Sequence, residues 1–294
     1  MSRIIFNLVL VLLVASVHVS DVKAECDKKF SDVAADHTAC STIDKSVGGV
    51  KGIDATTKAQ ILKISNDYRA RQQAKNMAKL VWDDEVAMIA QKHAERCVYG
   101  HDENYQRNIP GRFSVGQNIA IGRSNWELSL RDWYIEVDNF VYGMGAKDVK
   151  EDIGHYTAMV WATTLKIGCG YAKCDYKGND LGYYVCNYGP AGNGRNINKP
   201  YISGTKGSDC KTKTSDGLCD CGDIECDNGG HLNPENCECQ CPNFEWIIKE
   251  NNCKHDCTKA PATPGWFCFS ADDCKVYSSM MVECPKMCGL CPSD

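Results

Sequence analysis

His155 lies directly before a run of apolar and aromatic residues, in the stretch GHYTAMVW at 154–161. An imidazole there can act as a general base, bind a metal ion, or stabilise the fold as a buried polar group. Covalent hydrolysis would also require a nucleophile beside its base. Nothing in the spacing pairs Ser114 or Thr157 with a histidine and a third orienting group. The elements around His155 must therefore decide among the three roles.

Cysteine is the most unusual feature of the composition. The 294 residues include 20 cysteines, six of them before residue 187 and fourteen between 210 and 291. A dense and even set of cysteines indicates disulfides formed in an oxidising compartment. The net charge of −5 gives no reason to expect nucleic acid as a partner. A chain of this length is expected to contain two or more domains.

The first 24 residues have the features of a secretory signal peptide. Arg3 gives a positive start, residues 4–19 are almost wholly apolar, and small residues precede a predicted cleavage after Ala24. No later segment approaches the ~20 apolar residues that a membrane span requires. The mature protein is therefore predicted to be secreted and extracellular, and not membrane-spanning.

Hydrophobic periodicity predicts helices in the first half of a main domain and strands in the second. Helical spacing runs from Ala59 to Gln72, from the acidic turn at 83–85 to Cys97, and from Trp126 to Phe140. Strands are predicted at 167–174 and 182–188, with a turn at 175–180. This order favours an α+β domain at 57–200, after an irregular N-terminal extension at 25–56 in which Cys26 and Cys40 are expected to pair.

Four stretches of the main domain resemble the CAP superfamily of cysteine-rich secretory, antigen 5 and pathogenesis-related proteins. They are GHYTAMVWATT (154–164), YYVCNYGPAGN (183–193), GQNI (116–119) and ILKISNDYR (61–69), the last with Ser65 where the family usually has histidine. The resemblance covers residues 57–200 and implies an α-β-α sandwich with a central cleft. It also implies the disulfides Cys97–Cys169 and Cys174–Cys186.

The family's cleft holds two histidines and two glutamates. The matching positions here are His101 (in YGHD), Gln117 (in GQNI), Glu136 (in WYIE) and His155 (in GHYT). The amide of Gln117 keeps hydrogen bonding but cannot act as a general base or carry negative charge. His101, Glu136 and His155 could still hold Zn²⁺, with water in the open position. We favour a structural role of these residues over catalysis, with no cofactor required.

Two small disulfide-rich modules are expected after the main domain, because segments this short cannot bury enough apolar area alone. Residues 221–253 resemble an EGF-like module, through CDNGGHLNPENCECQCP at 226–242. With its hinge, this region occupies 205–254. Cys210 and Cys219 have the appearance of an additional hinge bridge, although other pairings of the eight cysteines from 210 to 253 stay open.

Residues 257–291 resemble the ShKT fold of potassium-channel toxins, through the cysteine spacing and the ending CPKMCGLC. The resemblance implies Cys257–Cys291, Cys268–Cys284 and Cys274–Cys288. Channel-blocking members use an adjacent Lys-Tyr pair, whereas this chain has Ser-Ser-Met-Met at 278–281 and separates Lys275 from Tyr277. Met280, Met281 and Phe269 are candidates for an apolar contact surface or for packing inside the module.

Three functions compete at this stage. The first is a non-enzymatic binding protein for a sterol, a fatty acid or an extracellular protein or receptor, as the CAP resemblance implies. In this case the stretch DNFVYGMG at 138–145 either lines a lipid pocket or is a structural loop. The second is a venom or defence effector that acts on an ion channel through the ShKT-like tail. The third, a metal-dependent protease, is disfavoured by Gln117 and by the missing nucleophile.

Overall fold

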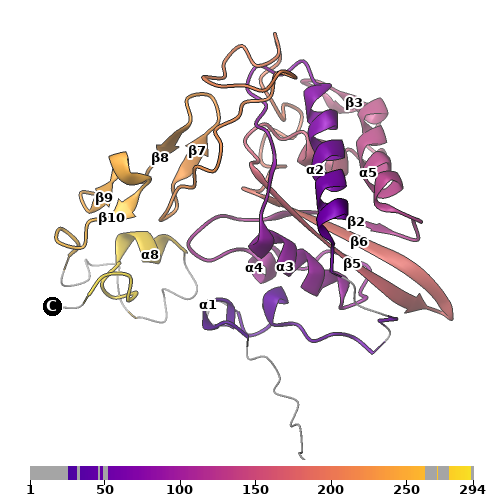
Figure 1. Ribbon diagram of the computed structural model, residues 1–294, viewed down its shortest axis with the longest axis horizontal. Coiled ribbons are helices and arrows are strands. Elements are labelled where there is room, and N and C mark those ends of the chain that lie inside the picture. The colour runs from indigo at the N-terminus through magenta and orange to yellow at the C-terminus, as the bar shows by residue number, and fades with distance from the viewer. Residues whose placement is uncertain are drawn as a thin grey trace, which may run out of the picture.

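The computed structural model describes residues 26–31, 34–45, 47–48, 52–261, 270 and 278–292, so the predicted signal peptide lies outside the described residues. The main domain has three layers (Figure 1). A central sheet lies between α2 and α5 on one side and α3 and α4 on the other. This is the α-β-α sandwich expected from the sequence. Within the described residues, no helix is long and apolar enough to cross a membrane.

The sheet has the strand order β1-β5-β6-β2. Its centre is the antiparallel pair β5 (Lys166–Tyr176) and β6 (Asn179–Gly189). Both strands extend beyond the predicted ranges, because Tyr176 pairs with Asn179 and leaves Lys177 and Gly178 as the turn. These two residues have φ angles of 54° and 81°, the left-handed conformation of a tight two-residue hairpin.

Two further strands complete the sheet. β2 (Gly116–Ile121) runs antiparallel to β6 at one edge, and β1 (Val81–Trp82) runs parallel to β5 at the other. GQNI is a recognisable motif in the sequence, but its pattern alone does not predict a strand. β2 is an edge strand of this sheet, with β6 as its neighbour on one side.

The helices begin at polar caps. α2 (Ala55–Ala70) begins four residues before the predicted start, because the Asp54 carboxylate accepts the backbone N–H of Thr57. In α3 (Asp84–Ala94), Asp83 caps the first turn. The third predicted helix divides into α5 (Trp126–Tyr134) and the 3₁₀ helix η2 (Ile135–Asn139). The short helix α6 (Gly154–Met159) contains His155 and was not predicted.

The remaining elements are short. They are α1 (Lys28–Ser31), η1 (Thr38–Cys40), α4 (Asn104–Arg107), β3 (Phe140–Val141), β4 (Gly145–Ala146), β7 (His231–Asn233), β8 (Glu238–Gln240), β9 (Ile247–Ile248), η3 (Lys249–Asn251), β10 (Lys254–His255) and α8 (Ser278–Glu283). β3 with β4, β7 with β8, and β9 with β10 each form a small antiparallel pair.

Two of the disulfides implied by the family resemblance are wrong. The structure pairs Cys169 with Cys186 and Cys97 with Cys174, instead of Cys97–Cys169 and Cys174–Cys186. The register of the hairpin explains the difference. Cys169 lies directly opposite Cys186, with their Cα atoms 4.1 Å apart, whereas Cys174 lies opposite Leu181. Cys97, just after α3, reaches the same end of β5 as Cys174, at a Cα–Cα distance of 5.6 Å.

Each of the other disulfides lies within a single region of the chain. Cys26–Cys40 forms in the N-terminal extension and Cys210–Cys219 in the hinge, as the sequence analysis expected. The EGF-like region forms Cys221–Cys237, Cys226–Cys239 and Cys241–Cys253, and the tail forms the expected Cys257–Cys291. Cys284 and Cys288 are also disulfide-bonded. Their expected partners, Cys268 and Cys274, lie outside the described residues.

The hinge is bonded to the main domain rather than free of it. Backbone N–H groups of Gly204, Gly207 and Cys219 donate to the carbonyls of Gln73, Ala74 and Met77, at 2.9, 3.0 and 2.7 Å. In return, the N–H of Lys79 donates to the carbonyl of Cys219 at 2.8 Å. The segment 202–219 therefore continues the packing of the main domain beyond the predicted boundary at residue 200.

Glycines allow α3 to lie directly on β5. A Cβ atom at Gly168 would lie 2.1 Å from the backbone nitrogen of Ala87, and one at Gly170 would lie 2.3 Å from the Cα of Gln91. Backbone atoms of a helix cannot move aside as the end of a side chain can. The close contact of α3 with the sheet therefore requires glycine at both positions.

We predict that Gly168→Ala lowers the free energy of unfolding by about 2–3 kcal/mol, because α3 must move away from β5. Gly52→Ala is the matched control, since an added Cβ there meets nothing within 4 Å. Urea unfolding followed by tryptophan fluorescence measures both variants with the disulfides intact. Equal stability of the two variants would contradict the proposed contact.

Candidate functional site

The four residues predicted for the cleft form two pairs at the edge strand β2. Gln117 lies opposite Asn187, and Asn187 lies opposite Gly168, so these three side-chain positions share one face of the sheet. That face packs on α3, as the close approach of Gly168 to Ala87 demonstrates. Asn118 points to the opposite face, where its Nδ2 donates to the carbonyl of His155 at 3.1 Å. The two pairs therefore reach β2 from opposite faces.

The first pair is His101 with Gln117. The imidazole Nδ1 of His101 lies 2.8 Å from Oε1 of Gln117. Because an amide oxygen only accepts, Nδ1 carries the hydrogen and Nε2 keeps its lone pair in the neutral ring. Gln117 is 9% exposed, while His101 lies in the exposed loop after α3. The Nε2 amide nitrogen of Gln117 is buried without a hydrogen-bond partner among the described residues.

The second pair is His155 with Glu136. Oε1 of Glu136 lies 2.6 Å from Nδ1 of His155. Oε2 accepts the backbone N–H groups of His155 and Tyr156, at 2.8 and 3.0 Å. Both N–H groups belong to the first turn of α6, where no carbonyl of the same helix is available to accept them. Glu136 therefore orients the imidazole and caps the helix with the same carboxylate.

Trp133 connects the second pair to β2, and the sequence analysis did not assign it a site role. Its ring stacks on the ring of His155 at 6.2 Å between centroids and an interplanar angle of 20°. Its Nε1 donates to the carbonyl of Ile119 at 3.0 Å. The only sequence signal for this contact is the position of Trp133 on the apolar face of the predicted third helix.

The geometry bears on the expected Zn²⁺ site at His101, Glu136 and His155. Within the described ranges, no group of three or more His, Cys, Asp or Glu side chains is placed to hold a metal ion. Both oxygens of Glu136 already accept hydrogen bonds, one of them from the ring of His155. Zn²⁺ held by His101, Glu136 and His155 stays a prediction.

The candidate nucleophiles do not approach the imidazoles. Thr157 is fully buried, and its hydroxyl donates to the carbonyl of Ile153 at 2.9 Å within its own helix. Ser114 is exposed at the loop before β2, and its carbonyl accepts the N–H of Ala191. Neither hydroxyl has a hydrogen bond to a histidine in the structure, as covalent hydrolysis would require.

The stretch at 138–145 contains most of the β3–β4 hairpin. Some of its side chains are buried in the core and others are exposed. Phe140 is buried, with its ring 5.2 Å from the ring of Tyr156. Tyr142 packs beside Tyr201 and donates its hydroxyl to the Tyr201 carbonyl at 2.6 Å. Met144, near the tip of the hairpin, is 79% exposed. Of these apolar side chains, Met144 is the one most available to a ligand.

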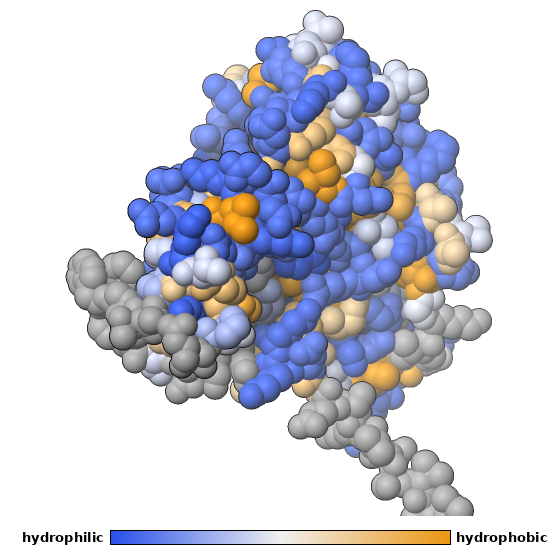
Figure 2. All heavy atoms as spheres, turned by 60° about the vertical axis from the view of Figure 1, so that its left-hand side comes forward, coloured by the Kyte–Doolittle hydropathy of each residue, from blue (hydrophilic) through white to orange (hydrophobic). Residues whose placement is uncertain are grey.

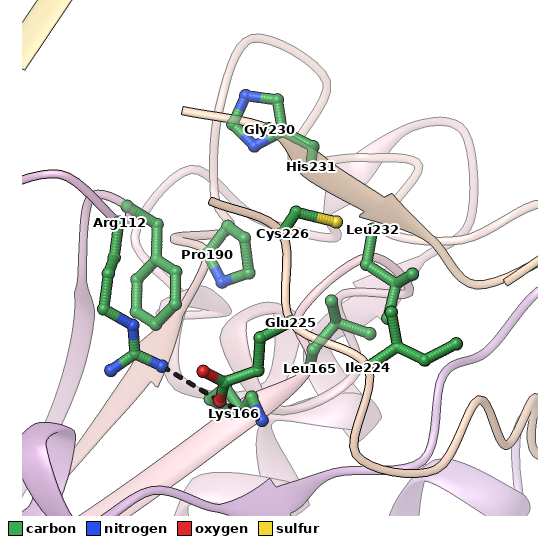
Figure 3. Close-up of a pocket in the computed structure, with 11 residues that line it drawn as sticks. Arg112, Leu165, Lys166, Pro190, Ile224, Glu225, Cys226, Gly230, His231 and Leu232 are labelled. Atoms are coloured by element: carbon green, nitrogen blue, oxygen red, sulfur yellow. Dashed lines mark hydrogen bonds and ion pairs between the residues drawn. The ribbon is translucent and has the colours of Figure 1, made fainter. Parts of the chain in front are cut away.

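A small hollow, which the sequence did not indicate, lies between the main domain and the EGF-like region (Figure 3). Leu232 of β7 points toward Leu165 of the main domain, and Glu225 reaches toward Arg112 and Lys166. The Glu225 carboxylate lies 2.9 Å from Lys166 Nζ and 3.4 Å from Arg112. The space is about 30 Å³, roughly enough for one water molecule. This hollow is therefore a docking contact between modules rather than a ligand pocket.

The tail packs on the EGF-like region. Val282 of α8 is buried in a cluster with Ile247 and Cys253, and Trp246 Nε1 donates to the Val282 carbonyl at 2.8 Å. The Met280 sulfur lies 3.9 Å from Sγ of Cys284, which favours internal packing for this residue. The side chains of Met281 and Phe269 lie outside the part of the chain that the structure describes. Figure 2 shows that this side of the molecule is mainly hydrophilic, with small separate apolar groups.

A three-layer sandwich with paired histidines at its sheet edge, followed by disulfide-rich modules, defines a CAP-domain protein. The model of the cysteine-rich secretory protein family (CAP) matches residues 62–188. Cysteine-rich venom protein Mr30 of Conus marmoreus is 34% identical over 303 residues, covering 96% of both chains. Human cysteine-rich secretory protein 2 is 37% identical over 147 residues, covering 50% of this chain and 60% of its own. The chain therefore belongs to the cysteine-rich secretory protein family.

Solved structures are similar over the same domain. The crystal structure of Na-ASP-1 is 27% identical and covers 60% of this chain and 50% of its own, with a TM-score of 0.49. The venom allergen-like protein 4 of Schistosoma mansoni is 30% identical and covers 53% of this chain and 99% of its own, with a TM-score of 0.44.

We predict that Glu136→Gln accelerates hydrogen exchange at the amides of His155 and Tyr156 about tenfold, because the charged acceptor of both N–H groups is lost. Asp138→Asn, an exposed residue of the same 3₁₀ helix, is the matched control and should leave both amides unchanged. Native-state exchange followed by NMR measures these amides individually. Unchanged protection in Glu136→Gln would show that the carboxylate does not cap α6.

Proposed function

We propose that this protein is a secreted binding protein that acts by recognition and not by turnover. In this proposal the CAP domain binds a sterol, a fatty acid or an extracellular protein, and the two C-terminal modules contribute recognition surfaces. The observation that carries the proposal is the set of hydrogen bonds that the cleft residues already make. The carboxylate of Glu136 is committed to His155 and to α6, and Gln117 supplies an amide in place of a second carboxylate.

The same observation argues against a metal-dependent protease. A general base needs a free acceptor beside a nucleophile or an activated water. Here the hydroxyl of Thr157 donates to the carbonyl of Ile153, and both oxygens of Glu136 already accept hydrogen bonds from His155. The two imidazole Nε2 atoms remain as polar groups for binding. In this proposal Zn²⁺ is a ligand of the cleft and has no catalytic step.

Secretion is supported by the covalent structure and by the relatives. The described residues form eight disulfides with assigned partners, and such bonds persist in oxidising compartments. The apolar segment at 4–19 and the expected cleavage after Ala24 agree with export. The matching relatives have the names of venom and secretory proteins.

For the lipid ligand we expect the β3–β4 hairpin to make contact. Met144 exposes 79% of its surface, and an unbranched thioether side chain adapts its shape to an apolar partner. Covering such a side chain with a lipid removes apolar area from water, which is favourable. The neighbouring Tyr142 is held by Tyr201, so the hairpin presents Met144 from a defined position.

We predict that the protein secreted by eukaryotic cells binds cholesterol or oleate, and that Met144→Ser weakens binding about tenfold. Val149→Ser is the control, because Val149 is 97% exposed but lies outside the hairpin. Calorimetry with EDTA and with added Zn²⁺ tests whether the ligand needs the metal. Absence of heat with either lipid, and of lipid in organic extracts examined by mass spectrometry, would exclude the lipid ligand.

The second candidate is a venom or defence effector on an ion channel. The full-length similarity to cysteine-rich venom proteins of Conus favours it, since the match covers 96% of this chain and not only the CAP domain. The sequence Ser-Ser-Met-Met at 278–281 replaces the Lys-Tyr pair expected of a pore blocker. A channel partner would therefore be recognised by other surfaces of the tail.

We predict under this second candidate that the full-length protein reduces a voltage-gated potassium current while Lys275→Ala has the same effect as the native chain. The reason is that an isolated lysine without its adjacent tyrosine does not form the pore-blocking pair. Voltage-clamp recording of channels in oocytes measures both. No effect of the native chain on the current would remove the channel from consideration, and loss of the effect in Lys275→Ala would restore direct pore block.

A further inference from the structure

The N-terminal extension contacts the segment that contains His101. The extension was expected to be irregular, and apart from α1 and η1 it has no helix in the described residues. It nevertheless runs along α3 and α4 on the outer side of the domain (Figure 1). We call residues 34–45 the strap. The loop from 101 to 108, which begins with His101 and includes the single turn of α4, contacts it.

Three consecutive residues of the strap each bond to this loop. The Asp36 carboxylate accepts Nε2 of Gln106 at 2.7 Å, and His37 Nε2 lies 2.9 Å from the carbonyl of Asn108. The Thr38 hydroxyl donates to the carboxylate of Asp102 at 2.5 Å. A run of three adjacent residues with three partners fixes the position of a loop better than one contact does, because each bond removes a separate freedom of the chain.

His37 fits this role through its tautomer. A carbonyl only accepts, so Nε2 of His37 carries the hydrogen toward Asn108. Its Nδ1 accepts the backbone N–H of Ala39 at 3.1 Å. Burial lowers the pKa of His37, which keeps the ring in the neutral form that these two bonds require. The strap therefore approaches the loop without burying an unpaired charge.

Asp102 connects the strap with His101, because Asp102 directly follows His101 in the chain. Its side chain is completely buried, with Arg107 Nη1 at 2.9 Å and His93 Nδ1 at 3.4 Å. Burial alone would raise the pKa of Asp102, but His93, Thr38 and Arg107 together hold it well below its usual value. The carboxylate therefore stays ionised, and its bonds to Thr38 and Arg107 hold residue 102, the covalent neighbour of His101, in place.

The loop also fixes the other partner of the first pair. Arg107 Nε donates to the carbonyl of Val115 at 2.8 Å, and the N–H of Val115 donates to the Asn108 side chain at 3.2 Å. Val115 lies two residues before Gln117. The same loop thus positions the backbone on both sides of the His101–Gln117 hydrogen bond.

We infer that the strap residues Asp36, His37 and Thr38 position His101 in the cleft, so that the N-terminal extension is a part of the site and not a spacer. Thr38 and Asp102 act as positioning residues, because neither has a contact with the cleft groups themselves. The inference rests on the cleft of the proposed function. Its readout is the hydrogen bonding of His101, which can be measured whatever ligand the cleft binds.

The test uses the full mature chain labelled with ¹⁵N at its histidines. Above the titration of the rings, the ¹⁵N shifts of Nδ1 and Nε2 report which nitrogen carries the hydrogen. In the native protein we expect the Nδ1–H form for both His101 and His155. In Thr38→Val the difference between the Nδ1 and Nε2 shifts of His101 should fall by about half or more. The two shifts of His155 should stay unchanged.

Three further variants make the test decisive. Thr38→Ser restores the hydroxyl and should restore the native shifts of His101. Ser41→Ala alters a strap residue outside the three-residue set and should leave His101 unchanged. Asp36→Ala removes the acceptor of the Gln106 bond at an exposed strap position and should shift His101 in the direction of Thr38→Val, which keeps the test available if the buried variant fails to fold.

The outcomes separate the inference from the proposed function. Native shifts of His101 in folded Thr38→Val and in Asp36→Ala would overturn the positioning role. Equal changes at His101 and His155 would also overturn it, because they would indicate general loosening of the domain. A lipid or protein that fails to bind the native chain would overturn the proposed function and leave the strap inference intact.

Discussion

The buried guanidinium of Arg69 is the interaction on which the domain depends. Its side chain is fully enclosed, and no carboxylate balances its charge among the described contacts. It instead donates to backbone carbonyls of two separate segments, at Ala78, Met159, Trp161, Ala162 and Thr164. Burial lowers the pKa of Arg69 to about 9, so the group stays charged at neutral pH. A buried charge without these carbonyls would be strongly destabilising, so α2 and the segments at 78 and 159–164 must fold together.

This constraint fixes His155 from both ends of its helix. Arg69 holds the C-terminal end of α6 through Met159, and Glu136 holds the N-terminal end through the amides of His155 and Tyr156. Between them, the Tyr156 hydroxyl donates to the side chain of Gln72, two residues after the end of α2, at 3.0 Å. A histidine held at so many points is suited to recognition by a preformed surface, because little ordering remains to be lost when a ligand binds.

The parts of the site that the sequence could predict are those in which a residue of a recognisable motif makes the contact. The pairs His101–Gln117 and His155–Glu136 come from separate motifs 16 and 19 residues apart, and the structure brings each pair within hydrogen-bonding distance. The family resemblance was necessary here, because periodicity carries no information about which side chains meet. The disulfides at 97, 169, 174 and 186 were mispaired for a related reason. Only the hairpin register places Cys169 opposite Cys186, and a two-residue turn was not distinguished from a six-residue one.

The segments that periodicity leaves without assignment make many of the long-range contacts. The strap and the hinge at 202–219 have few apolar repeats, so hydrophobic patterns do not reveal where they lie. Their positions are set by backbone hydrogen bonds, such as Cys219 to Met77, and by single side chains, such as Thr38 to Asp102. Such bonds depend on the tertiary arrangement of both partners and leave no local signature in the sequence. Irregular sequence in a disulfide-rich protein is therefore a poor guide to freedom of motion, because the covalent and backbone ties that order it are invisible to local patterns.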